Sequence, residues 1–196
     1  MIRQNSQRLA KIVDEVLNIS RAQVSSTEQN GMALVLDDTA GRMARDWAQH
    51  TSAAGVLRIS LAADHAVVVF DPEHLRRLLI NLLDNALRYA SPAVGAIEVA
   101  TQRLGPNQAR LSVWSDGPPI EKTVQTHLFE PFFSSESRSS GLGLYICREL
   151  CERYGALIGY QRAMRQLVEG NEFFVLFKPA AESSATAPPA FDDLFA

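Results

Sequence analysis

Three polar side chains recur at helical spacing within residues 72–89, a segment rich in leucine. Asn81, Asn85 and Arg88 lie four and three residues apart, so on a helix they share one face, away from the leucines. An amide oxygen is a hard neutral ligand that suits Mg²⁺, and a guanidinium one turn further on suits phosphate oxygens. The spacing therefore indicates a face that could hold magnesium together with phosphates. The alternative is a solvated face on which Asp84 and Arg88 form an i,i+4 ion pair.

Two further segments contain small residues that let a backbone approach an anion. Residues 115–120 read SDGPPI and directly follow a predicted strand. Residues 128–144 read LFEPFFSSESRSSGLGL and bring Gly141 and Gly143 to the start of a predicted helix, whose N-terminal end attracts phosphate. The serine-rich stretch before these glycines is suited to a lid over a nucleotide. Its anchors would be three phenylalanines, Phe129, Phe132 and Phe133.

The elements that must position these segments follow from the hydrophobic periodicity. Helices are predicted at 8–21, from Asp37 or Asp38 as N-cap to about His50, at 72–89 with Asp71 as N-cap, and at about 142–154. The buried stripe of the helix at 72–89 is predicted to comprise Leu75, Leu78, Leu79, Leu82, Leu83, Ala86 and Leu87. Strands are predicted at 57–61, 67–70, 97–104, 109–114, 157–164 and 172–177. These elements predict an α+β sandwich, in which helices cover one face of a mixed sheet.

The strands at 97–104 and 109–114 are predicted to form a hairpin around residues 105–107. In the second strand, Leu111 and Val113 are expected to face the core. The residues expected to face outward are Arg110, Ser112 and Trp114.

The composition excludes several classes of protein. With 19 basic and 22 acidic residues, the chain has a net charge of -3 and no general positive field for nucleic acid. No apolar stretch approaches the roughly 18 residues that cross a bilayer, and the start lacks the hydrophobic core of a signal peptide, so we expect a cytoplasmic chain. Cys147 and Cys151 are expected to pack as small hydrophobes on a helix, as fits a reducing cytosol.

Four motifs resemble those of the ATP-binding domain of bacterial sensor histidine kinases, in the same order and spacing. They are NLLDNALRY at 81–89 (the N box), SDGPPI at 115–120 (the first glycine box), LFEPFF at 128–133 (the F box) and GLGL at 141–144 (the second glycine box). These kinases belong to the GHKL superfamily, whose Bergerat fold is shared with gyrase and mismatch-repair ATPases. The run PFFSSESRSSGLGLYICREL is especially similar to the nitrogen-regulation and type IV pilus branch of sensor kinases.

The resemblance extends to the N-terminus, where RLAKIVDEVLNISR is similar to the second helix of the family's dimerisation hairpin. It implies a hairpin helix at 1–23, a linker at 24–33, a Bergerat-fold ATP-binding catalytic domain at 34–180 and a tail at 181–196. The tail is rich in alanine, serine and proline and ends in the aromatic and acidic run FDDLF. This composition predicts a loose terminus, with a docking peptide as the alternative.

The resemblance also implies roles at a site for ATP and Mg²⁺. Asn85 would coordinate the metal with Asn81 assisting, while Arg88 would face the phosphates and Tyr89 the adenine. The glycines of the second box would cradle phosphates through backbone amides, below a lid at 133–140. The residues that the resemblance places at ATP are Asn81, Asn85, Arg88, Tyr89, Ser115, Asp116, Gly117, Phe132, Phe133, Arg138, Ser140, Gly141, Leu142, Gly143 and Leu144.

Several positions depart from the family's pattern. Ser115 stands where an aspartate usually accepts a hydrogen bond from the adenine amino group, and Pro119 replaces a glycine of the same box. A serine hydroxyl accepts a hydrogen bond more weakly than a carboxylate does. In the lid, Glu136 replaces a common lysine, Ser139 replaces a glycine, and Arg138 could supply the missing positive charge. These changes predict weak-to-moderate affinity for ATP.

By resemblance, the parent enzyme is a histidine kinase that acts as a homodimer. It would transfer the γ-phosphoryl group of ATP to a histidine and then to the receiver domain of a response regulator. The acceptor would lie on the first helix of the hairpin beside an acidic residue, a context that His50, His65, His74 and His127 lack. We therefore expect the chain to bind ATP without autophosphorylation, with Met1 downstream of the acceptor and any membrane anchor in regions absent from it.

Two alternatives to the kinase interpretation stay open. In one, the chain is a degenerate regulatory module that keeps the fold for protein contacts and no longer binds nucleotide, as Ser115, Pro119 and Glu136 would suggest. In the other, it is a gyrase-like ATPase, which would need an acidic base on the N-box helix. Asp84 is the nearby candidate, and Arg88 is expected to neutralise it.

Overall fold

The computed structural model describes residues 31–106, 108–133 and 140–178. Its strands are β1 (Met32–Val35), β2 (Leu57–Ala62), β3 (Val67–Phe70), β4 (Ile97–Gly105), β5 (Gln108–Ser115), β6 (Leu157–Arg165) and β7 (Val168–Phe177). Its helices are α2 (Leu36–Thr51), α3 (Pro72–Tyr89), α4 (Lys122–Gln125) and α5 (Gly143–Arg153). The predictions for the N-terminal helix, Glu136, Arg138, Ser139 and the tail at 181–196 fall outside the described residues.

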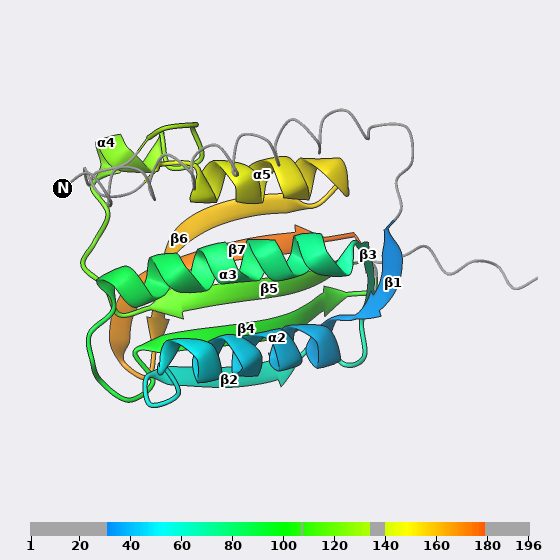
Figure 1. Cartoon of the computed structure of the whole chain (residues 1–196), viewed down its shortest axis with the longest axis horizontal. Helices are drawn as coiled ribbons and strands as arrows, with labels where there is room; N and C mark the ends of the chain where they lie inside the picture. Colours follow the sequence, from blue (N-terminus) through cyan, green and yellow to red (C-terminus); the bar gives the residue numbers. More distant parts are fainter. Residues whose placement is uncertain (1–30, 107, 134–139, 179–196) are drawn as a thin grey trace, which may run out of the picture.

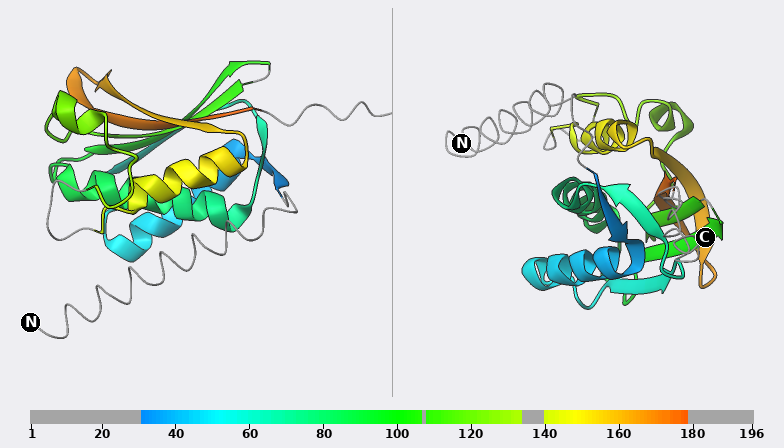
Figure 2. Two further views of the ribbon diagram at one scale, coloured as in Figure 1. Left: turned by 90° about the horizontal axis from the view of Figure 1, so that it is seen from above. Right: turned by 90° about the vertical axis from the view of Figure 1, so that its right-hand side faces the viewer.

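The main sheet has five strands in the order β2-β4-β5-β7-β6. Strands β2 and β4 are parallel, and the other neighbours are antiparallel. Helices α2, α3 and α5 lie on one face of this sheet, as Figures 1 and 2 show. The predicted α+β sandwich with a mixed sheet is therefore confirmed, as is the β4–β5 hairpin.

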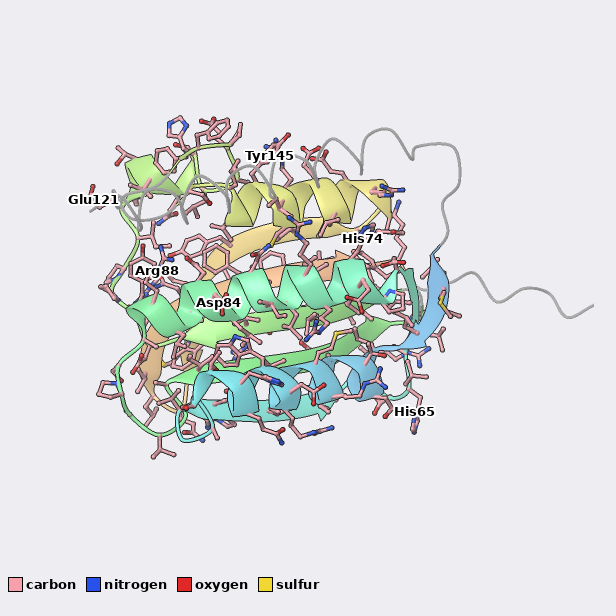
Figure 3. The ribbon with its side chains drawn as sticks, in the orientation of Figure 1. His65, His74, Asp84, Arg88, Glu121 and Tyr145 are labelled. Atoms are coloured by element: carbon pink, nitrogen blue, oxygen red, sulfur yellow. The ribbon has the colours of Figure 1, made fainter. Side chains whose placement is uncertain are left out.

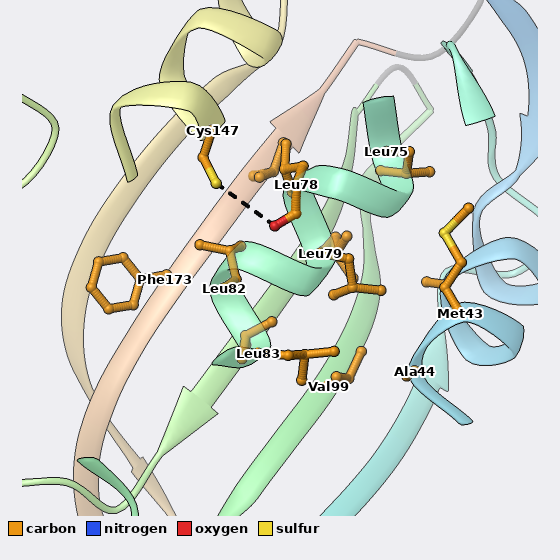
Figure 4. Close-up of a cluster of buried hydrophobic side chains, with 14 of the residues drawn as sticks. Met43, Ala44, Leu75, Leu78, Leu79, Leu82, Leu83, Val99, Cys147 and Phe173 are labelled. Atoms are coloured by element: carbon orange, nitrogen blue, oxygen red, sulfur yellow. Dashed lines mark hydrogen bonds between the residues drawn. The ribbon is translucent and has the colours of Figure 1, made fainter. Parts of the chain in front are cut away.

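Helix α3 lies between α2 and α5 at the centre of the core (Figures 1 and 4). Asp71 caps it as predicted, because its Oδ1 accepts a hydrogen bond from the backbone N–H of His74 at 2.9 Å. Five leucines of the stripe are fully buried: Leu75, Leu78, Leu79, Leu82 and Leu83. Each such burial contributes about 1.5–3 kcal/mol. Leu87 is instead 36% exposed, because each step of four residues advances about 40° and moves it past the edge of the stripe.

The beginning of helix α2 differs from the prediction. Neither Asp37 nor Asp38 is the N-cap, since the helix begins at Leu36 after Val35 in an extended conformation. The carboxylate of Asp37 accepts a hydrogen bond from the backbone N–H of Ala63 at 3.2 Å. This aspartate therefore ties the first turn of the helix to the segment between β2 and β3.

A second, two-stranded sheet pairs β1 with β3 in antiparallel register. Strand β3 matches the prediction at 67–70. Strand β1 is not predicted, and its first two residues fall in the predicted linker at 24–33. Its four residues, MALV, have no alternation of polar and apolar side chains from which a strand could be predicted. Phe70 at the end of β3 is fully buried, so the small sheet is continuous with the core.

The sheet face opposite the helices is covered more than predicted. Ser112 and Trp114 alternate with core residues as expected, yet they are only 4% and 2% exposed. The indole of Trp114 reaches across β7 and donates a hydrogen bond to the carbonyl of Ala163 on β6 at 2.9 Å. It lies over Gly170, where a Cβ atom would come within 2.4 Å of the indole. The missing side chain of that glycine therefore lets the indole lie flat on the sheet.

Helix α5 covers the other side of α3 and carries both cysteines. Cys147 and Cys151 are buried and free, as predicted, and the thiol of Cys147 donates to the carbonyl of Leu78 (Figure 4). Burial raises the pKa of Cys147 to about 12, so this thiol stays protonated at neutral pH. No helix within the described residues has the length and apolar character to span a membrane.

Candidate nucleotide-binding site

Helix α3 brings Asn81, Asn85 and Arg88 to the flank that faces α5 and the segment leading to α4. The two asparagines are partly exposed and Arg88 is exposed, so none of them is enclosed by the hydrophobic core. Figure 3 shows Arg88 near the C-terminal end of α3. The polar line predicted from the spacing is therefore present, with Arg88 exposed and the two asparagines partly exposed.

The ion pair considered as an alternative is not formed within the described residues. Asp84 Oδ1 instead accepts a hydrogen bond from Trp47 Nε1 on helix α2 at 2.8 Å. The expectation that Arg88 neutralises Asp84 is therefore wrong. The hydrogen bond from Trp47 holds the Asp84 carboxylate on the side of α3 that faces α2. Asp84 is therefore poorly placed as the acidic base of a gyrase-like mechanism.

The N-terminal end of α5 lies beside Asn81. A Cβ atom at Gly143, the first residue of that helix, would lie 3.8 Å from Asn81 Oδ1. No side chain caps this helix end, and Leu142 stands at the cap position. The first-turn N–H groups and the positive end of the helix dipole are therefore left for an anion next to Asn81.

Asn81 itself has an unsatisfied group. Its Nδ2 is buried and meets no strong hydrogen-bond acceptor among the described residues; the Asn81 amide makes only a weak contact with the Cys147 thiol, whose pKa it lowers. Leaving a buried donor unpaired costs about 1–3 kcal/mol, a cost that a phosphate oxygen or a metal-bound water could remove. An orphaned amide beside an uncapped helix end fits a magnesium-bound polyphosphate.

No three His, Cys, Asp or Glu side chains gather to hold a metal ion in the described part of the chain. A magnesium ion on this flank would therefore be held by the amide oxygens of Asn85 and Asn81, by phosphate oxygens and by water. Such an oxygen-only and water-rich shell is the one that Mg²⁺ prefers.

Gly141 has a conformation and a position that require glycine. Its φ is +68°, and a Cβ atom there would lie 2.5 Å from the carbonyl carbon of Phe132 and 2.8 Å from the backbone nitrogen of Phe133. The hydroxyl of Ser140 accepts a hydrogen bond from the N–H of Leu142 at 3.3 Å. The second glycine motif is thus packed directly against the end of the phenylalanine segment.

Of the three phenylalanines predicted to anchor the lid, Phe129 and Phe133 contact other rings and Phe132 does not. Phe129 stacks edge-on against Phe173 of β7, with ring centroids 6.4 Å apart, and Leu128 is buried. Phe133 lies against His127 at 5.4 Å, whereas Phe132 is 67% exposed and has a left-handed φ of +61°. The predicted lid residues after Phe133, including Arg138, lie outside the described residues.

The SDGPPI segment lies against the C-terminal end of α3. A Cβ atom at Gly117 would lie 3.0 Å from the carbonyl oxygen of Tyr89, so the two backbones are in close contact. Ser115 is 5% exposed and ends strand β5 on the face that the helices cover. Asn81 and Tyr89 are eight residues apart on α3, which corresponds to about 12 Å. That span suits a nucleotide whose phosphates lie at α5 and whose base lies at Tyr89.

Asp116 has a different environment from the one predicted. Its carboxylate accepts hydrogen bonds from the backbone N–H of Ser91 at 2.8 Å and from the hydroxyl of the same serine. Its own N–H donates to the carbonyl of Ala96 at 3.0 Å. Asp116 therefore holds the connection between α3 and β4, and its oxygens are already engaged.

Asn171 of β7 is a positioning residue that the sequence did not indicate. Its Nδ2 donates to the carbonyls of Gly117 at 3.2 Å and Pro118 at 2.8 Å. Its Oδ1 accepts hydrogen bonds from Tyr160 at 2.8 Å and from Arg162 at 3.1 Å. A lone asparagine in a predicted strand has no motif around it, and only the cross-strand pairing of Asn171 with Ser115 reveals this role.

Three of the four histidines contact neighbouring groups of the fold, and His65 is exposed. The Nδ1 atom of His74 lies 2.7 Å from the hydroxyl of Tyr154, and burial lowers the pKa of His74. His127 pairs with Glu130 at 2.9 Å on the surface, and His50 contacts the carbonyl of Asp46.

Comparison with known proteins identifies the family and relatives of the chain. Residues 70–182 match the family described as histidine kinase-, DNA gyrase B-, and HSP90-like ATPase. The chain is 32% identical over 168 residues to the sensor protein kinase PilS of Pseudomonas aeruginosa, an alignment that covers 82% of this chain and 30% of PilS. It is 29% identical over 161 residues to the swarming motility regulation sensor protein RssA of Serratia marcescens, covering 79% of this chain and 34% of RssA. The chain thus spans about a third of the length of these relatives.

Solved structures share the fold. The mycobacterial sensor histidine kinase MprB superposes with a TM-score of 0.64 at 22% identity, covering 76% of this chain and 97% of that one. The histidine kinase AdeS of Acinetobacter baumannii gives a TM-score of 0.67 at 19% identity, with 90% of this chain and 81% of that one covered. A full-length ShkA structure in complex with AMPPNP gives a TM-score of 0.71 at 22% identity, covering 91% and 38% of the two chains.

Proposed function

The chain belongs to the family of histidine kinase-, DNA gyrase B- and HSP90-like ATPases and is homologous to the catalytic domains of sensor histidine kinases, and from this premise we propose that it binds Mg-ATP along helix α3. The observation that carries the proposal is the placement of Asn81, whose unpaired amide lies beside Gly143 at the uncapped end of α5. The complex of full-length ShkA with AMPPNP, an ATP analogue, supports the same use of this fold.

On this proposal the chain's residues bind and orient a nucleotide without forming a covalent bond to it. Asn85 and Asn81 hold Mg²⁺, which when bound draws charge from the phosphate oxygens. The N-terminal amides of α5 hold phosphate oxygens, and exposed Arg88 adds a positive charge on the same flank. Tyr89 and the SDGPPI segment receive the base. Such a site works by positioning and electrostatics.

The parent protein, on the same proposal, is a histidine kinase of a two-component system. It transfers the γ-phosphoryl group of the bound ATP to a histidine that is none of the four in this sequence, and from there to the receiver domain of a response regulator. Homodimerisation would use the helix predicted at 8–21. The catalytic domain itself would act in the cytoplasm.

The second candidate is a degenerate module that keeps the fold for protein contacts only. Two observations favour it: the site has Ser115 in place of a carboxylate, and the carboxylate of Asp116 is engaged by Ser91. The orphaned amide of Asn81 argues against it, because a site without a ligand gains nothing from a buried unpaired donor.

Asn85→Ala distinguishes the two candidates. Asn85 is only partly buried and alanine is the better helix former, so the domain should stay folded. On the proposed function, calorimetric titration with Mg-ATP should show binding to the unaltered chain and a loss of at least tenfold in affinity for the variant.

The matched control is Arg76→Ala, an exposed position nine residues earlier and therefore on the opposite side of α3. It should bind Mg-ATP as the unaltered chain does. If the chain binds no Mg-ATP, or if Asn85→Ala binds it equally well, the proposed site on α3 is wrong and the degenerate module is favoured.

A further inference from the structure

Ser115 stands at the base end of the proposed nucleotide site, where the neighbouring polar side chains are already engaged. We propose that its hydroxyl makes this a purine nucleoside triphosphate site of low base selectivity, which accepts a 6-oxopurine such as hypoxanthine or guanine nearly as well as adenine. The proposal rests on the proposed function and specifies its substrate class.

The position of Ser115 is fixed by three strands. It pairs with Ile97 of β4 on one side and with Asn171 of β7 on the other. A Cβ atom at Gly170 would lie 2.2 Å from the carbonyl oxygen of Ser115, so β7 packs tightly against this backbone. Leu111 and Val113 lie on the same face of β5 as Ser115 and are core residues beneath the helices. The side chain therefore lies on the helix-covered face, at the end of the strand that leads into SDGPPI.

The carboxylate next to Ser115 is held by Ser91 and is not free to turn toward a base. Both oxygens of Asp116 accept hydrogen bonds from Ser91, one from its backbone N–H and one from its hydroxyl. Turning this carboxylate toward the nucleotide would break both bonds and would release the connection that follows α3.

The amide opposite Ser115 is not available either. Asn171 uses its two amide hydrogens on the carbonyls of Gly117 and Pro118. Its oxygen accepts from Tyr160 and Arg162, which fills the capacity of the group. Asn171 therefore fixes the loop and has no donor or acceptor left for reading a base.

Ser115 differs from both neighbours. No side-chain hydrogen bond of Ser115 occurs among the described residues, so its hydroxyl is free to rotate. A carboxylate accepts hydrogen bonds only, and it would therefore select the 6-amino group of adenine and repel a 6-oxo group. A hydroxyl can accept from an amino group or donate to a carbonyl oxygen, so it can satisfy either purine.

This chemistry sets the expected selectivity. Because each purine can make one neutral hydrogen bond to Ser115, we expect the affinities for Mg-ATP and Mg-ITP to agree within about tenfold. ITP is the direct probe, since hypoxanthine lacks the 2-amino group of guanine and tests the 6-position without added bulk. Mg-GTP then tests whether the site also tolerates the 2-amino group.

The test is calorimetric titration of the chain with Mg-ATP, Mg-ITP and Mg-GTP, before and after Ser115→Asp. That substitution should strengthen Mg-ATP binding, weaken Mg-ITP binding and so shift the ATP-to-ITP preference by at least tenfold toward ATP, since charge-assisted hydrogen bonds are roughly twice as strong as neutral ones. Ser115→Ala, which keeps the small volume at this buried position, should weaken both nucleotides by a similar factor of several-fold.

Each outcome is decisive. An unaltered chain that binds Mg-ATP but discriminates against Mg-ITP by more than about tenfold overturns the inference and leaves the proposed function standing. Similar binding of both nucleotides that Ser115→Ala does not weaken also overturns it, and this variant decides the matter should Ser115→Asp fail to fold. Absence of binding by all three nucleotides overturns the proposed function itself.

Discussion

Removal of the Asn171 side chain should destabilise the domain and loosen the base end of the site together. In Asn171→Ala, the carbonyl of Pro118 loses its 2.8 Å hydrogen bond, and that of Gly117 keeps only a longer one from Arg162 at 3.4 Å. Tyr160 is partly exposed, so its hydroxyl can bond to water instead, and the loss of its hydrogen bond to Asn171 costs little. The poorly satisfied buried carbonyl of Gly117, the hydrogen bond lost by the part-buried carbonyl of Pro118 and the bond that Arg162 loses sum to about 3 kcal/mol.

Urea unfolding monitored by circular dichroism measures this loss of stability, which also corresponds to a Tm lower by about 6–12 °C for a domain of this size. Gln102→Ala removes an amide side chain from an exposed position of the same sheet and should change the stability by less than about 0.5 kcal/mol. The affinity for Mg-ATP should also fall in Asn171→Ala, because the SDGPPI segment loses its anchor. A loss of stability below about 1 kcal/mol would refute the role given to Asn171.

Further predictions concern the glycines, the core and pH. Gly141→Ala should destabilise the domain, because its φ is +68° and its Cβ would clash with Phe132, whereas Gly143→Ala meets only ordinary contact with Asn81 and should fold normally, as thermal unfolding would show. Leu79→Ala should cost about 2–5 kcal/mol in urea unfolding, since this leucine is fully buried. Burial lowers the pKa of His74 in the folded state, so its contribution to stability is present above the ordinary histidine pKa of about 6.5 and is lost as pH falls below it. Unfolding at pH 7.5 and 5.5 should therefore show a smaller loss of stability at the lower pH for His74→Gln than for the unaltered chain.

The elements with regular periodicity could be predicted from the sequence. The leucine stripe of α3, its Asp71 cap and the β4–β5 hairpin depend on local spacing and turn chemistry, and all three are present. The predicted start of α2 is wrong because Asp37 looks like an N-cap, whereas its actual partner, Ala63, is 26 residues away. Strand β1 was missed because its four residues depend on pairing with β3.

Some features of the candidate site could also be predicted from local spacing, and others could not. The polar line of Asn81, Asn85 and Arg88 follows from helical spacing, and the structure leaves all three residues at least partly exposed. The engagement of Asp116 by Ser91 and the role of Asn171 depend on contacts between segments far apart in the chain, which no local pattern encodes. The outward residue Trp114 was predicted on the correct face, but its burial depends on Gly170 in another strand.

The most direct test of a magnesium-dependent nucleotide site on α3 is calorimetric titration of the chain with ATP, with Mg²⁺ and then with a chelator in its place. Binding through the amide oxygens of Asn85 and Asn81 predicts saturable heat with Mg-ATP and an affinity at least tenfold lower without the metal. Saturable binding of equal strength in both titrations would contradict the metal-holding role of the two asparagines, and no binding in either would contradict the site itself.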